Sequence, residues 1–342
     1  MTARIPTLGL PISEEEFIYK TIRLYVLSKT SISTMRILLT GGAGFVGTNV
    51  VSELLKENHE VIIIDNLKTG YHKNIPDGVH FVHMDCSDEN LLSSFTEPFD
   101  VLIHIAGQAS KEKSFQDVFY DLNSNQKSTL VLLELCKKMN CKRFIFISTV
   151  CIYGGVSNPG QFIETSTPIF DTFYALHKYS SEHYCKLYCE QEQINYTIFR
   201  LFTCYGPHQD LTDTKKGMVS IFLNQFLQES NEVIVKGSLD RYRDFIYVGD
   251  VGRVLAKSLT KQETFRQIIN LGSGKKTTIR ELVDTMNRLG NFQKQIIEKP
   301  GIIGDMLGCY AETTKLVTLF PEIKFVDLEE GLQNMISYAR SL

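Results

Sequence analysis

The sequence lacks the features that mark membrane and nucleic-acid-binding proteins. No run approaches the roughly 18 consecutive apolar residues that a membrane-spanning helix needs. The formal net charge of −3 over 342 residues gives no overall field that would attract nucleic acid or an anionic membrane surface. Internal repeats and low-complexity tracts are absent too. We therefore expect an ordinary globular protein that binds neither nucleic acid nor a membrane.

The eight cysteines do not form a recognisable metal site or disulfide framework. Cys185 and Cys189 lie four residues apart, but no second Cys/His pair at zinc-ligand spacing accompanies them, so no metal is expected. The sequence also lacks a secretory signal, in which a basic segment precedes an apolar one. These features predict reduced thiols and a cytoplasmic location.

Residues 1–34 differ from the rest of the chain. ISEEEFIYKTIRLYVLSK is compatible with one short amphipathic helix, whereas MRILLTGG, which begins at Met35, reads as a natural protein start. Two interpretations stay open: residues 1–34 are an appended N-terminal extension, or Met35 is the true initiator.

From Met35 onward, short apolar runs alternate with longer helical stretches such as VGTNVVSELLKEN. The runs are rich in Val, Ile and Phe, as expected of strands buried on both faces of a parallel sheet: RILLT, EVIIID, VHFVHMD, DVLIHIA, RFIFIST and YTIFRLF. This order predicts an α/β fold with a Rossmann-like, doubly wound parallel sheet. After about Tyr205 the alternation gives way to shorter, mixed segments, which predict a smaller C-terminal α/β lobe.

A glycine-rich turn, TGGAGFVG, follows the first predicted strand and opens the first predicted helix. Glycines there permit a tight turn and let backbone N–H groups approach a pyrophosphate at the positive end of the helix. The turn predicts cofactor contacts at Gly41, Gly44, Phe45, Val46 and Gly47.

The second predicted strand ends in IIIDN. Asp65 is therefore placed where a carboxylate binds the 2′- and 3′-hydroxyls of a ribose, with Asn66 beside it. A carboxylate there repels a 2′-phosphate, so the pattern predicts NAD rather than NADP. The NAD-binding domain is expected over 35–204 and the substrate-binding lobe mainly over 205–342. Segments at about 240–275, including QIINLGS, are expected to return to the NAD-binding domain.

YALHK places Tyr174 and Lys178 on one face of a predicted helix. A free phenol has a pKa near 10 and is a poor base, but a nearby ammonium and a nicotinamide cation both favour the phenolate. Lowering this pKa by about 3 units requires roughly 4 kcal/mol of such interaction. The spacing also arises by chance on exposed helices; here it follows the glycine turn and the hydroxyl-bearing STVCIYG.

Together these motifs resemble the extended short-chain dehydrogenase/reductase family, in particular its NAD-dependent nucleotide-sugar epimerase/dehydratase branch. The resemblance runs from about Met35 to the C-terminus and includes HIAGQAS, DLNSNQKSTLVLLE, FRLFTCYGPHQ, RDFIYVGDV, INLGSG and LEEGL. In this family the tyrosine is the general base that takes a proton from a sugar hydroxyl while a hydride passes to NAD. The lysine orients the ribose.

The resemblance implies further site residues. A Ser or Thr completes the catalytic set, and Thr149 falls at that position, because Ser148 would point to the other side of an extended strand. The remaining cofactor contacts implied are Asp85, Cys86, Ala106, Gly107, Gln108, Asn123, Ser148, Tyr174 and Lys178.

The residues after Thr149 bear on the reaction. Sugar 4,6-dehydratases carry an Asp-Glu pair there, where this chain has Val150 and Cys151, so dehydration is not expected. Relatives that epimerise at C3 and C5 carry an acid/base cysteine two residues after the hydroxyl residue. Cys151 is thus either a candidate acid/base, with Lys216 as a candidate second one, or a small core residue.

Substrate contacts are implied at Thr149, Tyr174, Thr203, Val219, Arg243, Asp305 and Cys309. Arg243 and Asp305 would hold the nucleotide diphosphate. Thr203 departs from the usual Asn, and the second arginine expected just before Asp305 is missing. Cys309 matches a position where small residues admit 2-N-acetyl sugars, or it is a wall residue without this role.

The expected function is an NAD-dependent nucleotide-sugar 4-epimerase, with a UDP-sugar as the first choice of substrate. It would pass a hydride from sugar C4 to NAD and return it to the opposite face of the 4-keto sugar. One alternative is a 4-keto-sugar reductase/3,5-epimerase that uses Cys151. Another is a non-catalytic NAD-binding sensor or partner subunit. The resemblance also implies a homodimer formed through the helices containing STLVLLELCKK and YALHKYSSEHY.

Overall fold

The computed structural model describes residues 34–154, 159–213, 216–301 and 307–342. Residues 1–33 of the N-terminal extension and Asp305, a predicted substrate contact, lie outside the described residues. By their internal contacts, Met1–Thr34 and Met35–Leu342 form two separate units, and the fold that follows is that of the second.

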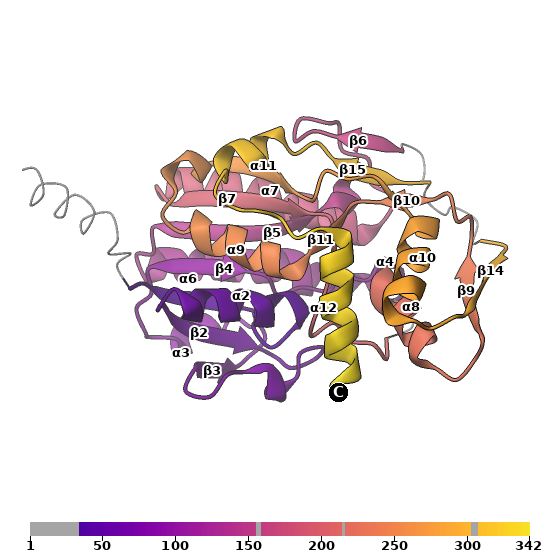
Figure 1. Cartoon of the computed structure of the whole chain (residues 1–342). Helices are drawn as coiled ribbons and strands as arrows, with labels where there is room; N and C mark the ends of the chain where they lie inside the picture. The colour runs from indigo at the N-terminus through magenta and orange to yellow at the C-terminus, as the bar shows by residue number, and fades with distance from the viewer. Residues whose placement is uncertain (1–33, 155–158, 214–215, 302–306) are drawn as a thin grey trace, which may run out of the picture. The chain divides into compact units, whose positions relative to one another are not determined.

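Seven strands among the described residues form one sheet with the order β12-β7-β5-β4-β1-β2-β3 (Figure 1). Every neighbouring pair is parallel. The chain moves outward from β1 to β3, crosses back to β4 and continues to β12, which confirms the predicted doubly wound topology. The strands are β1 (Arg36–Thr40), β2 (Glu60–Asp65), β3 (His80–His83), β4 (Val101–His104), β5 (Arg143–Thr149), β7 (Asn195–Leu201) and β12 (Gln267–Leu271).

Helices cover both faces of this sheet because its strands are apolar on both sides. Ile37 and Leu39 of β1 pack in one core cluster, and Leu38 between them packs in another. The first cluster includes residues of α2 (Phe45–Lys56), α9 (Val248–Ser258) and α11 (Thr314–Leu319). The second includes residues of α3 (Leu91–Ser94), α6 (Ser128–Lys138) and α7 (Phe173–Gln191).

The later part of the chain builds a separate core beside the sheet, at the right of Figure 1. Its helices are α8 (Met218–Leu227), α10 (Ile279–Gly290) and α12 (Leu328–Arg340), and β9 (Glu232–Lys236) pairs with β14 (Gln295–Lys299). A capping box between Thr278 and Glu281 fixes the start of α10. The boundary between an NAD-binding domain and a substrate lobe at residues 204 and 205 stays a prediction.

Short elements connect these two parts. The paired short strands are β6 (Gly160–Phe162) with β15 (Cys309–Ala311), β8 (Thr203–Tyr205) with β11 (Phe245–Tyr247), and β10 (Tyr242–Arg243) with β13 (Thr277–Thr278). The remaining short helices are α4 (Lys111–Gln116), α5 (Val118–Leu122), the π-helix η2 (Asn123–Lys127), and the 3-10 helices η1 (His72–Asn74), η3 (Val150–Tyr153) and η4 (Gln262–Thr264).

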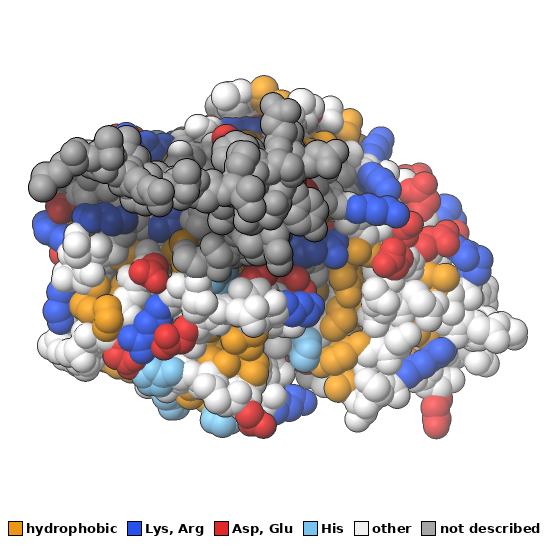
Figure 2. All heavy atoms as spheres, turned by 60° about the vertical axis from the view of Figure 1, so that its left-hand side comes forward, with side chains coloured by type: hydrophobic (Ala, Val, Ile, Leu, Met, Phe, Trp, Pro, Cys, Tyr) orange, Lys and Arg blue, Asp and Glu red, His pale blue; other side chains and the backbone are white. Residues whose placement is uncertain are grey.

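The surface and the cysteines agree with the composition. Figure 2 shows acidic and basic side chains interspersed over the described part of one face. None of the helices within the described ranges is long and apolar enough to cross a membrane. Those ranges also contain no group of three or more His, Cys, Asp or Glu residues arranged to hold a metal ion. All eight cysteines are free thiols.

Candidate active site

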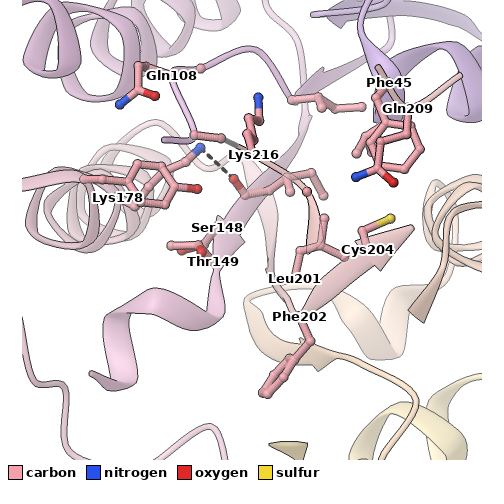
Figure 3. Close-up of a pocket in the computed structure, with 17 residues that line it drawn as sticks. Phe45, Gln108, Ser148, Thr149, Lys178, Leu201, Phe202, Cys204, Gln209 and Lys216 are labelled. Atoms are coloured by element: carbon pink, nitrogen blue, oxygen red, sulfur yellow. Dashed lines mark hydrogen bonds between the residues drawn. The ribbon is translucent and has the colours of Figure 1, made fainter. Parts of the chain in front are cut away.

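A cavity of about 260 Å³ lies at the carboxyl ends of the central strands (Figure 3). This is where ligands bind in open α/β sheets, beside the point at which the strand order reverses. None of the lining residues that the structure describes is acidic. The lining residues are Phe45, Val46, Ile105, Gly107, Gln108, Ala109, Ile147, Ser148, Thr149, Tyr174, Lys178, Leu201, Phe202, Cys204, Gln209, Lys216 and Gly217.

Two elements bring Tyr174 and Thr149 together in this cavity. Tyr174 is in the first turn of α7. Thr172 caps this helix, and its hydroxyl accepts a hydrogen bond from the Ala175 N–H at 3.1 Å. Thr149 is the last residue of β5. Burial raises the pKa of the Tyr174 phenol above its usual value, and a hydrogen bond with the Thr149 side chain opposes this rise. The phenol is therefore protonated at neutral pH in the protein without ligands.

Lys178 lies one helical turn beyond Tyr174 and is fixed in place. Its Nζ donates a hydrogen bond to the Ile147 carbonyl oxygen at 2.8 Å and lies 4.6 Å from the centre of the Phe146 ring. Burial lowers the pKa of Lys178 to about 8. The predicted set of Tyr174, Lys178 and Thr149 thus lines one cavity.

A buried pair of side chains, Asp121 of α5 and His177 of α7, lies beside this set. The Asp121 Oδ2 and His177 Nδ1 atoms are 2.7 Å apart, and both side chains are almost completely buried. Asp121 also accepts a 2.6 Å hydrogen bond from the Gln108 amide, which lines the cavity. The Asp121 charge raises the pKa of both Tyr174 and Lys178, after the larger effect of burial. The sequence interpretation missed Asp121, since a carboxylate before a helix is also a common surface residue.

In the glycine turn, the surrounding backbone leaves no room for a side chain at two of the glycines but leaves room at the third. Gly41 has a φ of +76°, and a Cβ there would lie 2.8 Å from the Ala106 nitrogen. A Cβ at Gly47 would overlap the Gly41 carbonyl. At Gly44 a Cβ would meet only the Gly41 oxygen, at 3.4 Å. No side chain caps α2, so its first N–H groups remain available to a phosphate group.

Asp65, Asn66 and Asp85 form a connected acidic edge next to this turn. Asp65 accepts hydrogen bonds from the N–H groups of Ala43 at 3.1 Å and Leu67 at 2.8 Å, and burial raises its pKa. The Asn66 amide donates to Asp85 at 2.7 Å. Burial would raise the pKa of Asp85, but hydrogen bonds from Ser87 and Asn66 lower it overall.

The buried asparagine beside the lining residue Gly107 is Asn125, whereas the sequence predicts a cofactor contact at Asn123. Asn123 is exposed, and Asn125 is completely buried. The π-helix Asn123–Lys127 adds an extra residue to the helical turn, which changes the face on which each side chain lies. A Cβ at Gly107 would lie 2.6 Å from Asn125 Oδ1, so the glycine permits this close approach.

Three buried oxygen atoms in or beside the cavity have no hydrogen-bond partner among the described residues: Ser148 Oγ, Asn125 Oδ1 and Gln209 Oε1. Buried polar atoms usually have partners, so these three suit a polar ligand. Ser148 lines the cavity together with Thr149, although we expected it to point to the other side. β5 ends at Thr149 and passes directly into η3, so the alternation of a regular strand does not extend through this position.

The other predicted substrate residues that the structure describes do not line this cavity. Val219 is fully buried in the core around α8, and Thr203 lies on β8. Arg243 and Cys309 are buried near one another: burial raises the pKa of the Cys309 thiol to about 12, and the Arg243 charge opposes the rise. Cys151 is half-buried, and its N–H donates to Thr149 Oγ1 at 3.2 Å.

Two predicted cofactor contacts lie close to the glycine turn but not as liners of the cavity. The Ala106 N–H donates to the Thr40 carbonyl at 3.2 Å, so this residue links β1 to the loop after β4. Cys86 is buried in the core, where burial raises the pKa of its thiol.

The doubly wound fold, with Tyr174 and Lys178 lining a cavity at the carboxyl ends of its strands, is that of a nucleotide-dependent α/β enzyme. The chain belongs to the NAD dependent epimerase/dehydratase family, whose model matches residues 37–272. The predicted family, fold and NAD cofactor are thereby confirmed, and the protein is an NAD-dependent sugar-nucleotide epimerase.

Several UDP-glucose 4-epimerases are similar to this chain over about 90% of its length. A putative UDP-glucose 4-epimerase of Methanocaldococcus jannaschii is 33% identical over 311 residues, covering 89% of this chain and 98% of the relative. The crystal structure of UDP-glucose 4-epimerase from Thermotoga maritima with UDP-glucose has a TM-score of 0.84 and 32% identity, covering 90% of this chain and 99% of that one. The Thermus thermophilus UDP-glucose 4-epimerase complex with NAD has a TM-score of 0.78 and 30% identity, with the same coverage.

Proposed function

We propose that the protein interconverts UDP-sugars that differ in configuration at C4, a reaction of carbohydrate biosynthesis. The observation that carries the proposal is the set of Tyr174, Thr149 and Lys178 in one cavity at the carboxyl ends of the strands. UDP is the proposed nucleotide because the relatives with the same fold act on UDP-glucose.

Tyr174 is the proposed general base for the sugar C4 hydroxyl. Bound NAD supplies the hydride acceptor and a positive nicotinamide. The phenol, which burial keeps protonated, gains acidity from that positive charge, from the Lys178 ammonium and from the Thr149 hydroxyl. Tyr174 then takes the proton of the C4 hydroxyl in the first half of the cycle and returns it to that oxygen in the second. Net redox change is zero, so turnover needs no added coenzyme.

The residues around the glycine turn are the proposed NAD site. The free N–H groups at the start of α2, with Gly44, Phe45 and Val46, suit the pyrophosphate. Asp65 is proposed for the adenosine ribose, and the Asn66–Asp85 pair for the adenine. Asn125 and Ser148 offer unpartnered oxygens toward the nicotinamide end.

Two accompanying proposals concern assembly and location. Leu130 of α6 is 36% exposed, and Leu176 and Leu187 of α7 are 41% and 67% exposed. Apolar side chains on two adjacent helices support a homodimer formed through them. The free thiols support a reducing, cytoplasmic location.

The test is an NMR assay in deuterated buffer. The purified chain is incubated, without added NAD, with UDP-, GDP-, dTDP- and CDP-sugars, and the anomeric signals are followed. We expect interconversion of C4 epimers of a UDP-sugar without deuterium uptake, and loss of turnover in Tyr174→Phe. Turnover that persists in Tyr174→Phe would refute the assigned base.

The same assay separates the alternative reaction at C3 or C5. Cys151 is close enough for its charge to raise the pKa of Tyr174, which keeps it a candidate acid/base. In that case deuterium enters at C3 or C5, and Cys151→Ser abolishes the uptake.

A further inference from the structure

Lys216 gives the cavity a second positive charge. Lys216 directly precedes Gly217, the residue before the first turn of α8. It lines the cavity together with Tyr174 and Thr149. Figure 3 shows its side chain between the Lys178 side of the cavity and the side formed by Phe45 and Gln209. The left-handed φ of +88° at Gly217 fixes the backbone at this point.

The two lysines of the cavity differ in their partners. Lys178 is buried and donates to the Ile147 carbonyl. The Lys216 ammonium has no hydrogen bond or ion pair within the described ranges; only its backbone carbonyl is bonded, by Ser220 Oγ at 3.5 Å. None of the described lining residues is acidic, so the cavity itself does not neutralise this cation.

The surroundings of Lys216 are mixed in charge. Burial of the ammonium is the main reason why the pKa of Lys216 is lowered, and Lys113 lowers it further. Asp213 and Asp210 raise it. Lys216 is nevertheless an exposed residue, so its ammonium is open to an anion from the substrate.

The position of Lys216 in the cavity indicates which anionic group of a ligand it could bind. Arg243, the cation expected to hold the nucleotide diphosphate, does not line this cavity. Lys216 instead shares the cavity with Tyr174 and Thr149, the residues proposed to act at C4 of the sugar. On the sugar itself, the anionic oxygens nearest to C4 would be those of a carboxylate attached to C5.

We propose that Lys216 binds a carboxylate on the sugar, so that the substrates of this site are nucleotide-linked uronic acids rather than neutral hexoses. The inference rests on the proposed 4-epimerase function. An ammonium–carboxylate hydrogen bond is stronger than one to a neutral hydroxymethyl group, and it strengthens further where water is partly excluded. The preference therefore acts on substrate binding and leaves the chemistry at C4 to Tyr174.

The experiment compares Lys216→Gln with the wild type on UDP-glucuronate and UDP-glucose. We expect the wild type to prefer the uronate. In Lys216→Gln, kcat/KM for the uronate should fall about 10- to 100-fold, mainly through KM, because a hydrogen bond to a charged group is lost. The value for UDP-glucose should stay within about threefold. Lys216→Arg, which keeps the charge, should retain most of the preference.

Lys113→Gln is the matched control. It removes a positive charge whose field reaches Lys216 but whose side chain does not line the cavity. The ratio of the two kcat/KM values should be unchanged in this variant.

The other sources of anionic oxygen give different results. An equal loss on both substrates in Lys216→Gln would assign Lys216 to the substrate diphosphate and overturn the proposal. A fall in the NAD content of purified Lys216→Gln, measured after denaturation, would assign Lys216 to the cofactor and overturn it too.

Failure of the two proposals can be told apart. If the wild type epimerises UDP-sugars and Lys216→Gln leaves the substrate ratio unchanged, only the inference on Lys216 fails. If no nucleotide sugar is epimerised, the proposed function fails. Calorimetric Kd values of the NAD-loaded wild type and Lys216→Gln for the same two ligands then still test the uronate preference.

Discussion

At the scale of single residues, the buried ammonium of Lys178 lowers the stability of the folded protein. Its pKa in the folded protein is about 8, below the ordinary lysine value of 10.5, because the ammonium is buried. Between pH 8 and 10.5 the unfolded chain therefore binds more protons at this residue than the folded one. The resulting destabilisation is fully present below pH 8 and disappears as the pH rises to 10.5.

Because the buried ammonium destabilises the folded protein, removing it in Lys178→Met should be stabilising. At pH 7 the NAD-free variant should be more stable than the NAD-free wild type by up to about 3 kcal/mol, since 1.36 kcal/mol corresponds to one pKa unit. The difference should shrink toward pH 10.5. Urea unfolding at pH 7, 9 and 10.5 measures it. A pH-independent difference would contradict the buried-charge explanation.

Asp121 should act on the pH profile through its charge. Asp121→Asn removes a charge that raises the pKa of Tyr174, so the acidic limb of kcat/KM should shift to lower pH. Weakening of the buried hydrogen bond with His177 should also cost about 1–3 kcal/mol of stability. The pH–rate profile and urea unfolding report the two effects.

Asp117→Asn is the matched control for Asp121→Asn. Asp117 lies four residues earlier and caps α5 by accepting a hydrogen bond from the Tyr120 N–H at 2.9 Å. Asparagine caps helices equally well. Neither the pH profile nor the stability should change, and a shift in this control as large as that of Asp121→Asn would remove the case for Asp121.

At the scale of the elements, different glycines of the turn between β1 and α2 are expected to serve stability and cofactor binding. Gly44→Ala should leave the free energy of unfolding within about 1 kcal/mol, because its Cβ meets only an oxygen at 3.4 Å and its φ of −85° is open to alanine. The added methyl group would instead occupy the approach of a pyrophosphate. The purified variant should therefore contain little NAD.

Gly47→Ala should give the opposite pattern. Its Cβ would overlap a backbone carbonyl of the turn, so we expect a loss of about 1–3 kcal/mol or more in stability. Chemical unfolding and the NAD released on denaturation are measured for both variants. Equal NAD contents in Gly44→Ala and the wild type would contradict the proposed pyrophosphate position.

Most elements could be predicted from sequence, and the exceptions have a common cause. YTIFRLF was expected as a strand over 196–202, and β7 spans Asn195–Leu201. The π-turn at Asn123–Lys127 was not expected, because hydrophobic periodicity does not report a single inserted residue within a helix. That turn decides that Asn125 rather than Asn123 is buried below Gly107.

η3 is a second case in which tertiary contacts decided the outcome. Tyr153, the tyrosine of the STVCIYG motif, is completely buried. Its hydroxyl donates to Asn270 at 2.6 Å and accepts from Arg200 at 2.9 Å, which ties η3 to β12 and β7. Its partners lie far away in the sequence, so no local pattern could have shown this role.

At the scale of the whole molecule, the proposed homodimer is testable on its exposed apolar face. Leu187→Glu should place a charge in the interface and raise the dimer dissociation constant about 30-fold or more, since interface hot spots contribute 2 kcal/mol or more. Val317→Glu is the control, because Val317 is 52% exposed on α11, which packs with the other core cluster. Sedimentation velocity compares the three proteins. A wild type that sediments as a monomer would refute the proposed assembly.

The sequence by itself determined the sheet, the glycine turn and the Tyr174–Lys178 pair, because each depends on residues close together in the chain. Runs of apolar residues indicate buried strands, and a spacing of four residues places Tyr174 and Lys178 on one face of a helix. The tertiary structure decided which distant side chains share the cavity. Lys216 joins Tyr174 there, while Val219 and Cys309 pack into cores instead. Such neighbours are set by the packing of separate elements, and no spacing along the chain encodes that packing locally.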